Sequence, residues 1–254
     1  MKNQSPIHHI LSCPDGRTIA YNRLEGKSVG VIFLGGFMSD MTGSKAIALE
    51  KHCKQRGHAF LRFDYSGHGQ SSGAFCDGTI TKWTDDAIFA IEQLTEGPQL
   101  LVGSSMGGWI MLLVALRLQK RIAGLIGVAA APDFTEDLIA RELNDEQCLA
   151  MKRDGYVCVP CNYNEKPYTI TQALIDDGRN NLLLNDVISL SQPVRLIQGM
   201  KDKDVPWTTV LKLQEKLIGD DVETILVKNG DHRLSEPQDL KRLTETLDYL
   251  LDKI

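Results

Sequence analysis

Gln99-Leu100-Leu101-Val102-Gly103-Ser104-Ser105-Met106-Gly107 joins an apolar run to a Gly-x-Ser-x-Gly motif, and a second apolar run extends from Gly108 to Leu116. This order predicts a strand, a sharp turn and a helix. Such a turn holds its serine in a strained backbone conformation and has room only for glycine two residues to either side. The pattern therefore predicts a nucleophile elbow that presents the Ser105 hydroxyl at the end of a sheet.

A serine hydroxyl is a weak nucleophile, so it needs a histidine base that is oriented by a carboxylate. After such an elbow, the acid and then the histidine each follow a later strand. Asp202 follows one apolar segment that ends in glycine, and His232 follows the next and is the only histidine after His68. We predict Ser105, Asp202 and His232 as the catalytic residues, with Asp204 as the less favoured alternative acid.

An oxyanion hole requires two backbone N–H groups that point at the reacting carbonyl oxygen. One belongs to the residue after the nucleophile, which is Met106. The other is expected in the loop after an early strand, where the apolar run Val31–Leu34 leads into Gly35-Gly36 and then Phe37. We therefore predict Met106 and Phe37 as the oxyanion-hole donors.

Strands alternate with helices along most of the chain, beginning with a hairpin whose turn is Pro14-Asp15-Gly16. This alternation predicts an α/β fold with a mostly parallel eight-stranded sheet flanked by helices. It stops between Pro132 and Ser191. We therefore assign residues 1–131 and 192–254 to the core, and residues 132–191 to a helical lid insertion over the nucleophile. The alternative is a surface excursion without a role in the site.

Within this insertion the sequence predicts helices over Thr135–Arg153 and Ile170–Leu184, with an irregular segment, Gly155–Pro167, between them. Cys158 and Cys161 form a CxxC in that segment. No second pair follows at zinc-ribbon spacing, and the motif does not lie at a strand–helix junction, so metal and redox roles are disfavoured. The sequence does not indicate what these cysteines do.

Composition excludes several classes of protein. The net charge of −5 comes without a basic stripe, so nucleic acid is not an expected partner. No apolar run is long enough to span a membrane. The first residues have neither a secretory apolar core nor an arginine-rich transit character, and the six cysteines have no framework spacing. These features predict a cytoplasmic protein with free thiols.

The chain resembles the α/β-hydrolase superfamily, in its serine-hydrolase branch, over nearly its whole length. A closer resemblance is to the mitochondrial acyl-glucuronide esterases and palmitoyl-protein thioesterases of that superfamily and to their bacterial relatives. The resemblance implies the same triad and oxyanion positions as above. Many members carry His-Gly where this chain has Gly35-Gly36, a change that keeps the backbone donor. The shared signatures are Arg62-Phe63-Asp64-Tyr65-Ser66-Gly67, Val102-Gly103-Ser104-Ser105-Met106-Gly107-Gly108-Trp109, Ala123-Gly124-Leu125-Ile126-Gly127-Val128-Ala129, Gly199-Met200-Lys201-Asp202, Val205-Pro206-Trp207 and Asp231-His232-Arg233.

We predict a serine hydrolase that cleaves carboxylic ester or thioester bonds of small-molecule or acyl substrates through an acyl-enzyme, without a metal or an organic cofactor. Phe37, Met38, Trp109 and Trp207 are candidates for an apolar acyl pocket, although core or rim packing explains each equally well. The alternatives are a serine aminopeptidase-like, lipase-like or cofactor-free peroxidase activity, or a non-catalytic receptor with a hydrolase fold. The sequence indicates neither the acyl group nor the oligomeric state.

Overall fold

The computed structural model describes residues 8–141, 143–159 and 167–254. The strands of its main sheet are β1 (His9–Ser12), β2 (Thr18–Leu24), β3 (Lys27–Leu34), β4 (His58–Phe63), β5 (Gln99–Ser104), β6 (Ile122–Val128), β9 (Val194–Gly199) and β10 (Val222–Val227). They lie in the order β1-β2-β4-β3-β5-β6-β9-β10. The β1–β2 and β2–β4 pairs are antiparallel and the other pairs are parallel. This confirms the predicted mostly parallel eight-stranded sheet.

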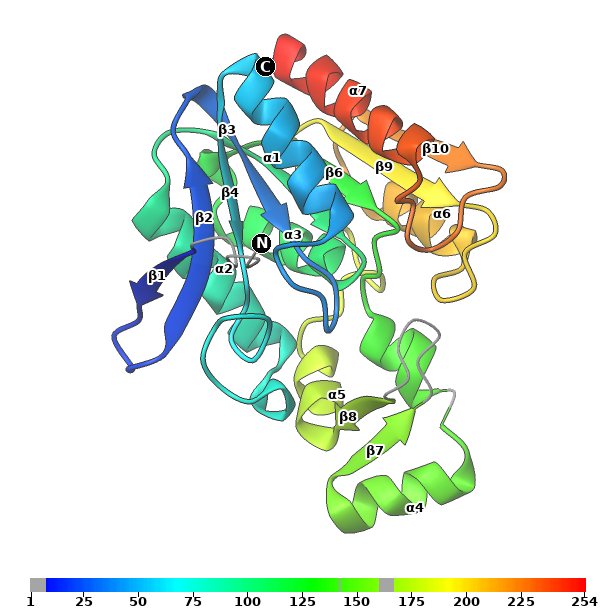
Figure 1. The fold of residues 1–254 in the computed structure, drawn as a ribbon. Coiled ribbons are helices and arrows are strands. Elements are labelled where there is room, and N and C mark those ends of the chain that lie inside the picture. The colour runs from blue at the N-terminus through cyan, green and yellow to red at the C-terminus, as the bar shows by residue number, and fades with distance from the viewer. Residues whose placement is uncertain (1–7, 142, 160–166) are drawn as a thin grey trace, which may run out of the picture.

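Helices cover both faces of the sheet (Figure 1). α1 (Ser44–Arg56) and α7 (Pro237–Lys253) pack together over one face. The other face is covered by α2 (Ile80–Leu94), α3 (Met106–Arg117) and α6 (Trp207–Lys216). No helix among the described residues is both long enough and apolar enough to cross a membrane.

Strand β3 shows why the central strands have continuous apolar sequences. Val31 and Phe33 pack into the core layer of α1 and α7. Ile32 and Leu34, which point the opposite way, pack into the layer of α2 and α3. Since both faces are buried, both sets of alternating positions must be apolar. The sheet is thereby fixed between two apolar cores. The loops at the ends of its strands lie outside these cores and can hold functional residues.

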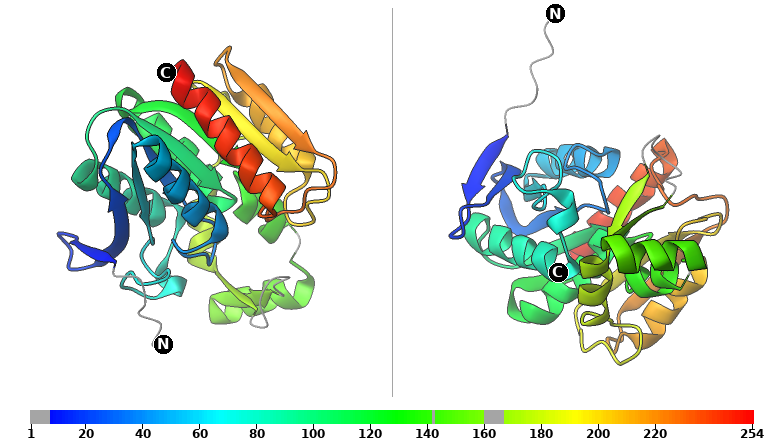
Figure 2. Two further views of the ribbon diagram at one scale, coloured as in Figure 1. Left: turned by 45° about the horizontal axis from the view of Figure 1, so that its top comes forward. Right: turned by 90° about the horizontal axis from the view of Figure 1, so that it is seen from below.

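The insertion lies at one end of the sheet and does not cover either face (Figure 2). It begins with a π-helical turn, Thr135–Ala140, which is followed by α4 (Asp145–Asp154). β7 (Tyr156–Val159) and β8 (Tyr168–Thr171) then pair antiparallel, and α5 (Gln172–Arg179) follows directly. Met151, Val157, Ile170 and Ile175 give this part a small apolar core of its own.

The helix predicted over Thr135–Arg153 is wrong in one respect, because the chain leaves and re-enters helical structure. Asn144 caps α4 and forms a capping box with Gln147, which starts a new helix there. The segment predicted to be irregular contains β7, and the helix predicted from Ile170 starts only at Gln172. Residues 160–166, including Cys161, lie outside the described residues.

The two ends of the insertion are joined by one buried carboxylate. Asp133 has a left-handed backbone conformation (φ 61°), and its two oxygens accept hydrogen bonds from the N–H groups of Leu183 and Leu184, both at 2.8 Å. Burial raises the pKa of this carboxyl group, and the two N–H donors oppose that shift. Because both backbone donors belong to the returning chain, Asp133 fixes where the insertion leaves and rejoins the core.

Candidate active site

Ser105 lies between β5 and α3 with φ 55° and ψ −121°, a conformation that non-glycine residues rarely adopt. Its N–H donates to the carbonyl of Val128 (3.0 Å). Its own carbonyl accepts from Gly108 (2.8 Å) and from Ala131 (3.1 Å). Hydrogen bonds from two neighbouring segments thus hold the strained residue in place, and the predicted elbow is present in the structure.

The glycines around Ser105 are required by close backbone approach. A Cβ on Gly103 would overlap the carbonyl of Gly107, and a Cβ on Gly107 would overlap the carbonyl oxygens of Leu34 and Gly35. Main-chain atoms of packed segments cannot move aside as a flexible side chain can. The motif therefore lets α3 start directly against the end of β3.

Gly107→Ala is expected to lower the free energy of unfolding by about 3 kcal/mol or more, because the new methyl group meets main-chain oxygens. In an open helix position, alanine would instead stabilise by about 1 kcal/mol. The matched control is Gly35→Ala, since a Cβ there has no atom within 4 Å outside its chain neighbours. Urea unfolding should show a large loss for Gly107→Ala alone. Equal losses in both variants would contradict this explanation.

The structure brings Ser105, His232 and Asp202 into one hydrogen-bonded chain. The Nδ1 of His232 lies 2.8 Å from Oδ2 of Asp202, and its Nε2 lies 3.1 Å from the Ser105 hydroxyl oxygen. An ionised carboxylate can only accept, so the Nδ1–H donates to Asp202. That tautomer leaves Nε2 with a lone pair toward the hydroxyl, which is the arrangement that a general base requires.

Asp202 is held by more donors than His232 alone. Its Oδ1 accepts from the N–H groups of Asp204 (2.9 Å) and Val205 (2.8 Å), and its Oδ2 also accepts from Nε2 of Gln198 (2.8 Å). Burial would raise the pKa of this carboxyl group, but the hydrogen bond and charge of His232 and the two N–H donors keep the pKa below its usual value. The carboxylate is therefore charged and fixed in orientation.

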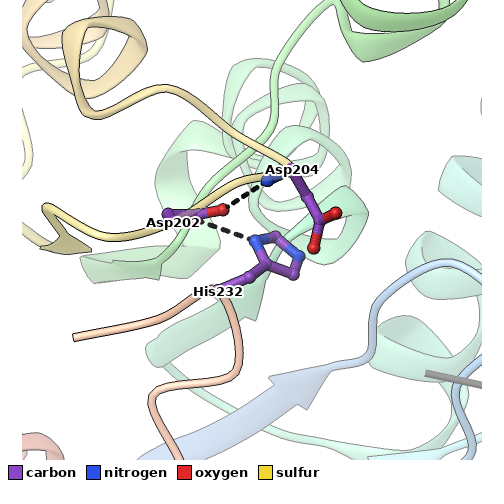
Figure 3. Close-up of side chains that lie close together, drawn as sticks. All are labelled: Asp202, Asp204 and His232. Carbon is purple, nitrogen blue, oxygen red and sulfur yellow. Dashed lines mark hydrogen bonds and ion pairs between the residues drawn. The ribbon is translucent and has the colours of Figure 1, made fainter. Parts of the chain in front are cut away.

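Asp202, Asp204 and His232 also offer ligand atoms that lie within 4.8 Å of one another (Figure 3). Both oxygens of Asp202 already accept two hydrogen bonds each. A cation bound to all three groups would have to displace the bonds that orient His232. The chemistry of this cluster therefore fits proton transfer better than metal binding.

Both predicted oxyanion donors, Met106 and Phe37, line the same cavity as Ser105 in the structure. Met106 is the first residue of α3, where helical N–H groups have no partner in their own helix. Gly36, next to Phe37, approaches so closely that a Cβ on it would lie 3.4 Å from Cβ of Ser105. Within the described residues, neither Met106 nor Phe37 donates its N–H to another protein group. Both N–H groups are thus available to a ligand.

The Phe37 side chain connects the core to the insertion. Its ring makes edge contacts with Phe75 (4.9 Å between centroids) and Trp83 (6.0 Å), which belong to the core. It makes similar contacts with Phe134 (5.6 Å) and Tyr168 (5.5 Å), which belong to the insertion. The loop that follows β3 is therefore held by aromatic contacts with both the core and the insertion.

A cavity of about 690 Å³ opens at Ser105 and His232. Phe37 and Met38 line it, as two of the four candidates for an apolar pocket. Trp109 is instead fully buried, with its indole N–H donating to the carbonyl of Asn181 (3.1 Å), and Trp207 is not in the lining. The insertion supplies one wall, made of Phe134, Leu138, Ile139, Val159, Tyr168 and Ile170.

The family described as serine aminopeptidase, S33 matches residues 30–159 of this chain. Palmitoyl-protein thioesterase ABHD10, mitochondrial, from Bos taurus is 42% identical over 248 residues, which cover 96% of this chain and 80% of that protein. The chain belongs to the ABHD10 family of α/β-hydrolases. The Homo sapiens ABHD10 is 40% identical over 248 residues, with the same coverage of 96% and 80%. The structure of mouse α/β-hydrolase domain-containing protein 10 matches with a TM-score of 0.90 at 40% identity, over 97% of this chain and 99% of that one.

Membership of the ABHD10 family confirms the predicted α/β-hydrolase fold and an enzyme that hydrolyses ester or thioester bonds. It contradicts the predicted cytoplasmic location, because the ABHD10 relatives are named as mitochondrial proteins. That prediction was wrong because it was drawn from the composition of the first residues and from the spacing of the six cysteines, neither of which identifies a compartment.

Proposed function

We propose that this protein hydrolyses thioesters and esters of apolar acyl groups by two-step acyl transfer through Ser105. His232 takes the proton of the hydroxyl group as Ser105 attacks the carbonyl carbon, and then gives that proton to the leaving group. Asp202 stabilises the imidazolium that forms in between. Water, deprotonated by His232, then releases the acid and restores the serine. The observation that carries the proposal is the Asp202–His232–Ser105 hydrogen-bonded chain at the cavity.

The N–H groups of Met106 and Phe37 are proposed to bind the oxyanion of each tetrahedral intermediate. Their position beside Ser105 and their lack of protein acceptors among the described residues support this role. A donor that is already in place costs no reorganisation when the negative charge develops. Each such N–H group is worth a factor of about 10²–10³ in rate.

Residues 132–191 are proposed to act as a lid that binds the acyl group. Their contribution to the cavity is an almost wholly apolar wall, which suits a hydrocarbon chain and excludes water from the acyl-enzyme. The relatives' name, palmitoyl-protein thioesterase, supports a long acyl group as the substrate class. Each buried methylene contributes about 0.8 kcal/mol, or at most about fourfold in kcat/KM.

Two measurements test this function. A fluorophosphonate should attach covalently to Ser105 in the unmodified protein and not in the His232→Ala variant, as mass spectrometry of the labelled peptide would show. Thioesters of graded acyl length should be hydrolysed with kcat/KM rising with chain length. Absence of labelling in the folded protein would favour the receptor alternative, and faster cleavage of aminoacyl anilides than of thioesters would favour a peptidase.

A further inference from the structure

One part of the cavity lining, outside the insertion, is polar and includes a lysine. Lys45, in the first turn of α1, lines this wall together with Arg233 and Ser235. Asp40 lies in the same wall, but its Oδ1 accepts from the N–H (2.7 Å) and the hydroxyl (2.5 Å) of Thr42. This carboxylate is therefore engaged within its own turn. The amino group of Lys45 is the charged group of α1 that the cavity exposes to a substrate.

The protein contacts of the Lys45 amine are all neutral. Its Nζ donates to the carbonyl of Arg233 (2.5 Å) and lies 3.4 Å from the hydroxyl oxygen of Ser235. In the described part of the chain, no carboxylate pairs with it. An ammonium group has three donors, and two of them are taken up by these oxygens. One donor is left for a group in the cavity.

The charged groups around Lys45 do not supply a counter-ion. Burial and the nearby Arg233 lower the pKa of Lys45 to about 8, while Asp231 and Asp239 oppose that shift. Asp231 accepts from a backbone N–H of its own loop (2.9 Å), and Asp239 pairs with Arg242 (2.8 Å). A half-buried ammonium group next to a second cation is stabilised by an anion. Within the described residues no carboxylate forms an ion pair with the Lys45 amine, so the group that would stabilise it is an anion in the cavity.

The location of Lys45 also fixes which part of a substrate it meets. His232 must reach the leaving atom to protonate it, so the leaving group sits beside the imidazole. The Lys45 amine bonds to the carbonyl of Arg233, the residue directly after His232. The acyl group extends along the apolar wall of the insertion in the function proposed above. Lys45 therefore lies on the leaving-group side.

We propose that Lys45 forms a subsite for an anionic leaving group, in which its ammonium group binds a carboxylate or phosphate a few bonds from the ester oxygen or thioester sulfur. This inference rests on the hydrolase function proposed above and extends it to substrate choice. It assigns the leaving group and the acyl group to different parts of the lining of one cavity.

The test compares two butanoyl thioesters that differ only in charge, those of mercaptopropionate and of mercaptopropionamide. Lys45→Met should lower the ratio of kcat/KM, anionic over neutral, by about tenfold, as expected for one charged hydrogen bond. Comparing this ratio between the variant and the unmodified protein cancels the intrinsic reactivity of the two thioesters. Lys45→Arg should retain most of the preference. Lys51→Met removes an exposed lysine from the same helix and should leave the ratio unchanged.

The pH dependence gives a second measurement. The anionic preference should fall as the pH rises through about 8, because Lys45 then loses its proton. The Lys45→Met variant should show no such fall. Equal losses for both thioesters in Lys45→Met would mean that Lys45 only supports the His232 loop, and an unchanged ratio would also overturn the subsite. If the unmodified protein hydrolyses neither thioester, the proposed function itself fails, and the subsite with it.

Discussion

Turnover is expected to fall by about 10⁶ in the Ser105→Ala variant, because the substitution removes the only atom that the proposed mechanism joins to the acyl group. The hydroxyl is the end point of the hydrogen-bonded chain from Asp202 through His232. Without it, His232 has no nucleophile to activate except water. The oxyanion donors remain, and binding with oxyanion stabilisation alone leaves a residual rate about 10³–10⁴ above that in water.

The measurement is kcat for a medium-chain thioester, together with mass spectrometry after brief mixing. The unmodified protein should show a transient mass increase equal to the acyl group, and Ser105→Ala should show none. Thermal unfolding provides the control, since the alanine variant should melt no lower than the unmodified protein. The hydroxyl makes no structural bond besides that to His232 among the described residues. Persistent turnover in a folded Ser105→Ala protein would contradict covalent catalysis.

The elbow could be predicted from sequence because its constraints are local. The glycines flanking Ser105 lie so close to main-chain atoms that a side chain would overlap them. The fold therefore requires glycine at these positions, and the requirement is visible in the sequence as a motif. Asp202 and His232 are far apart in sequence, but each follows a strand of a parallel sheet. The ends of such strands meet at one edge, so chain order was enough to bring them together.

The insertion could not be predicted as well, because its elements are short and stabilise one another. A single helix was expected where Asn144 and Gln147 form a capping box, although that signal was present in the sequence. Among the described residues β7 pairs only with β8, so neither strand has the long apolar run of the central sheet. The positions of apolar residues in the insertion depend on a small core that forms only when the chain folds.

Lys45 and Tyr168 carry no motif and were not predicted as site residues. Lys45 reaches the cavity because α1 begins next to the loop that carries His232, a contact between residues 188 positions apart. Tyr168 reaches it because β8 brings its ring against Phe37. Such positions follow from packing between distant segments, which one sequence does not reveal.

Asp202→Asn is expected to lower kcat by about 10⁴ with little change in the fold. The oxygen of the new side-chain amide would take the place that accepts from Asp204 and Val205, because two backbone donors face that position. The NH₂ group of the amide would then point at Nδ1 of His232. A donor there forces His232 to carry its proton on Nε2, toward Ser105, so the imidazole cannot accept the hydroxyl proton.

Asp204→Asn is the matched control, since it makes the same change two residues along the chain. Asp204 gives Asp202 a backbone N–H, which the substitution retains, and its carboxylate does not orient Nδ1 of His232 (Figure 3). We expect a loss of less than about fivefold, typical of removing a partly exposed charge. Steady-state kcat of both variants on one thioester makes the comparison. A larger loss in Asp204→Asn than in Asp202→Asn would transfer the role of the acid to Asp204, because only the carboxylate that fixes the His232 tautomer can have so large an effect.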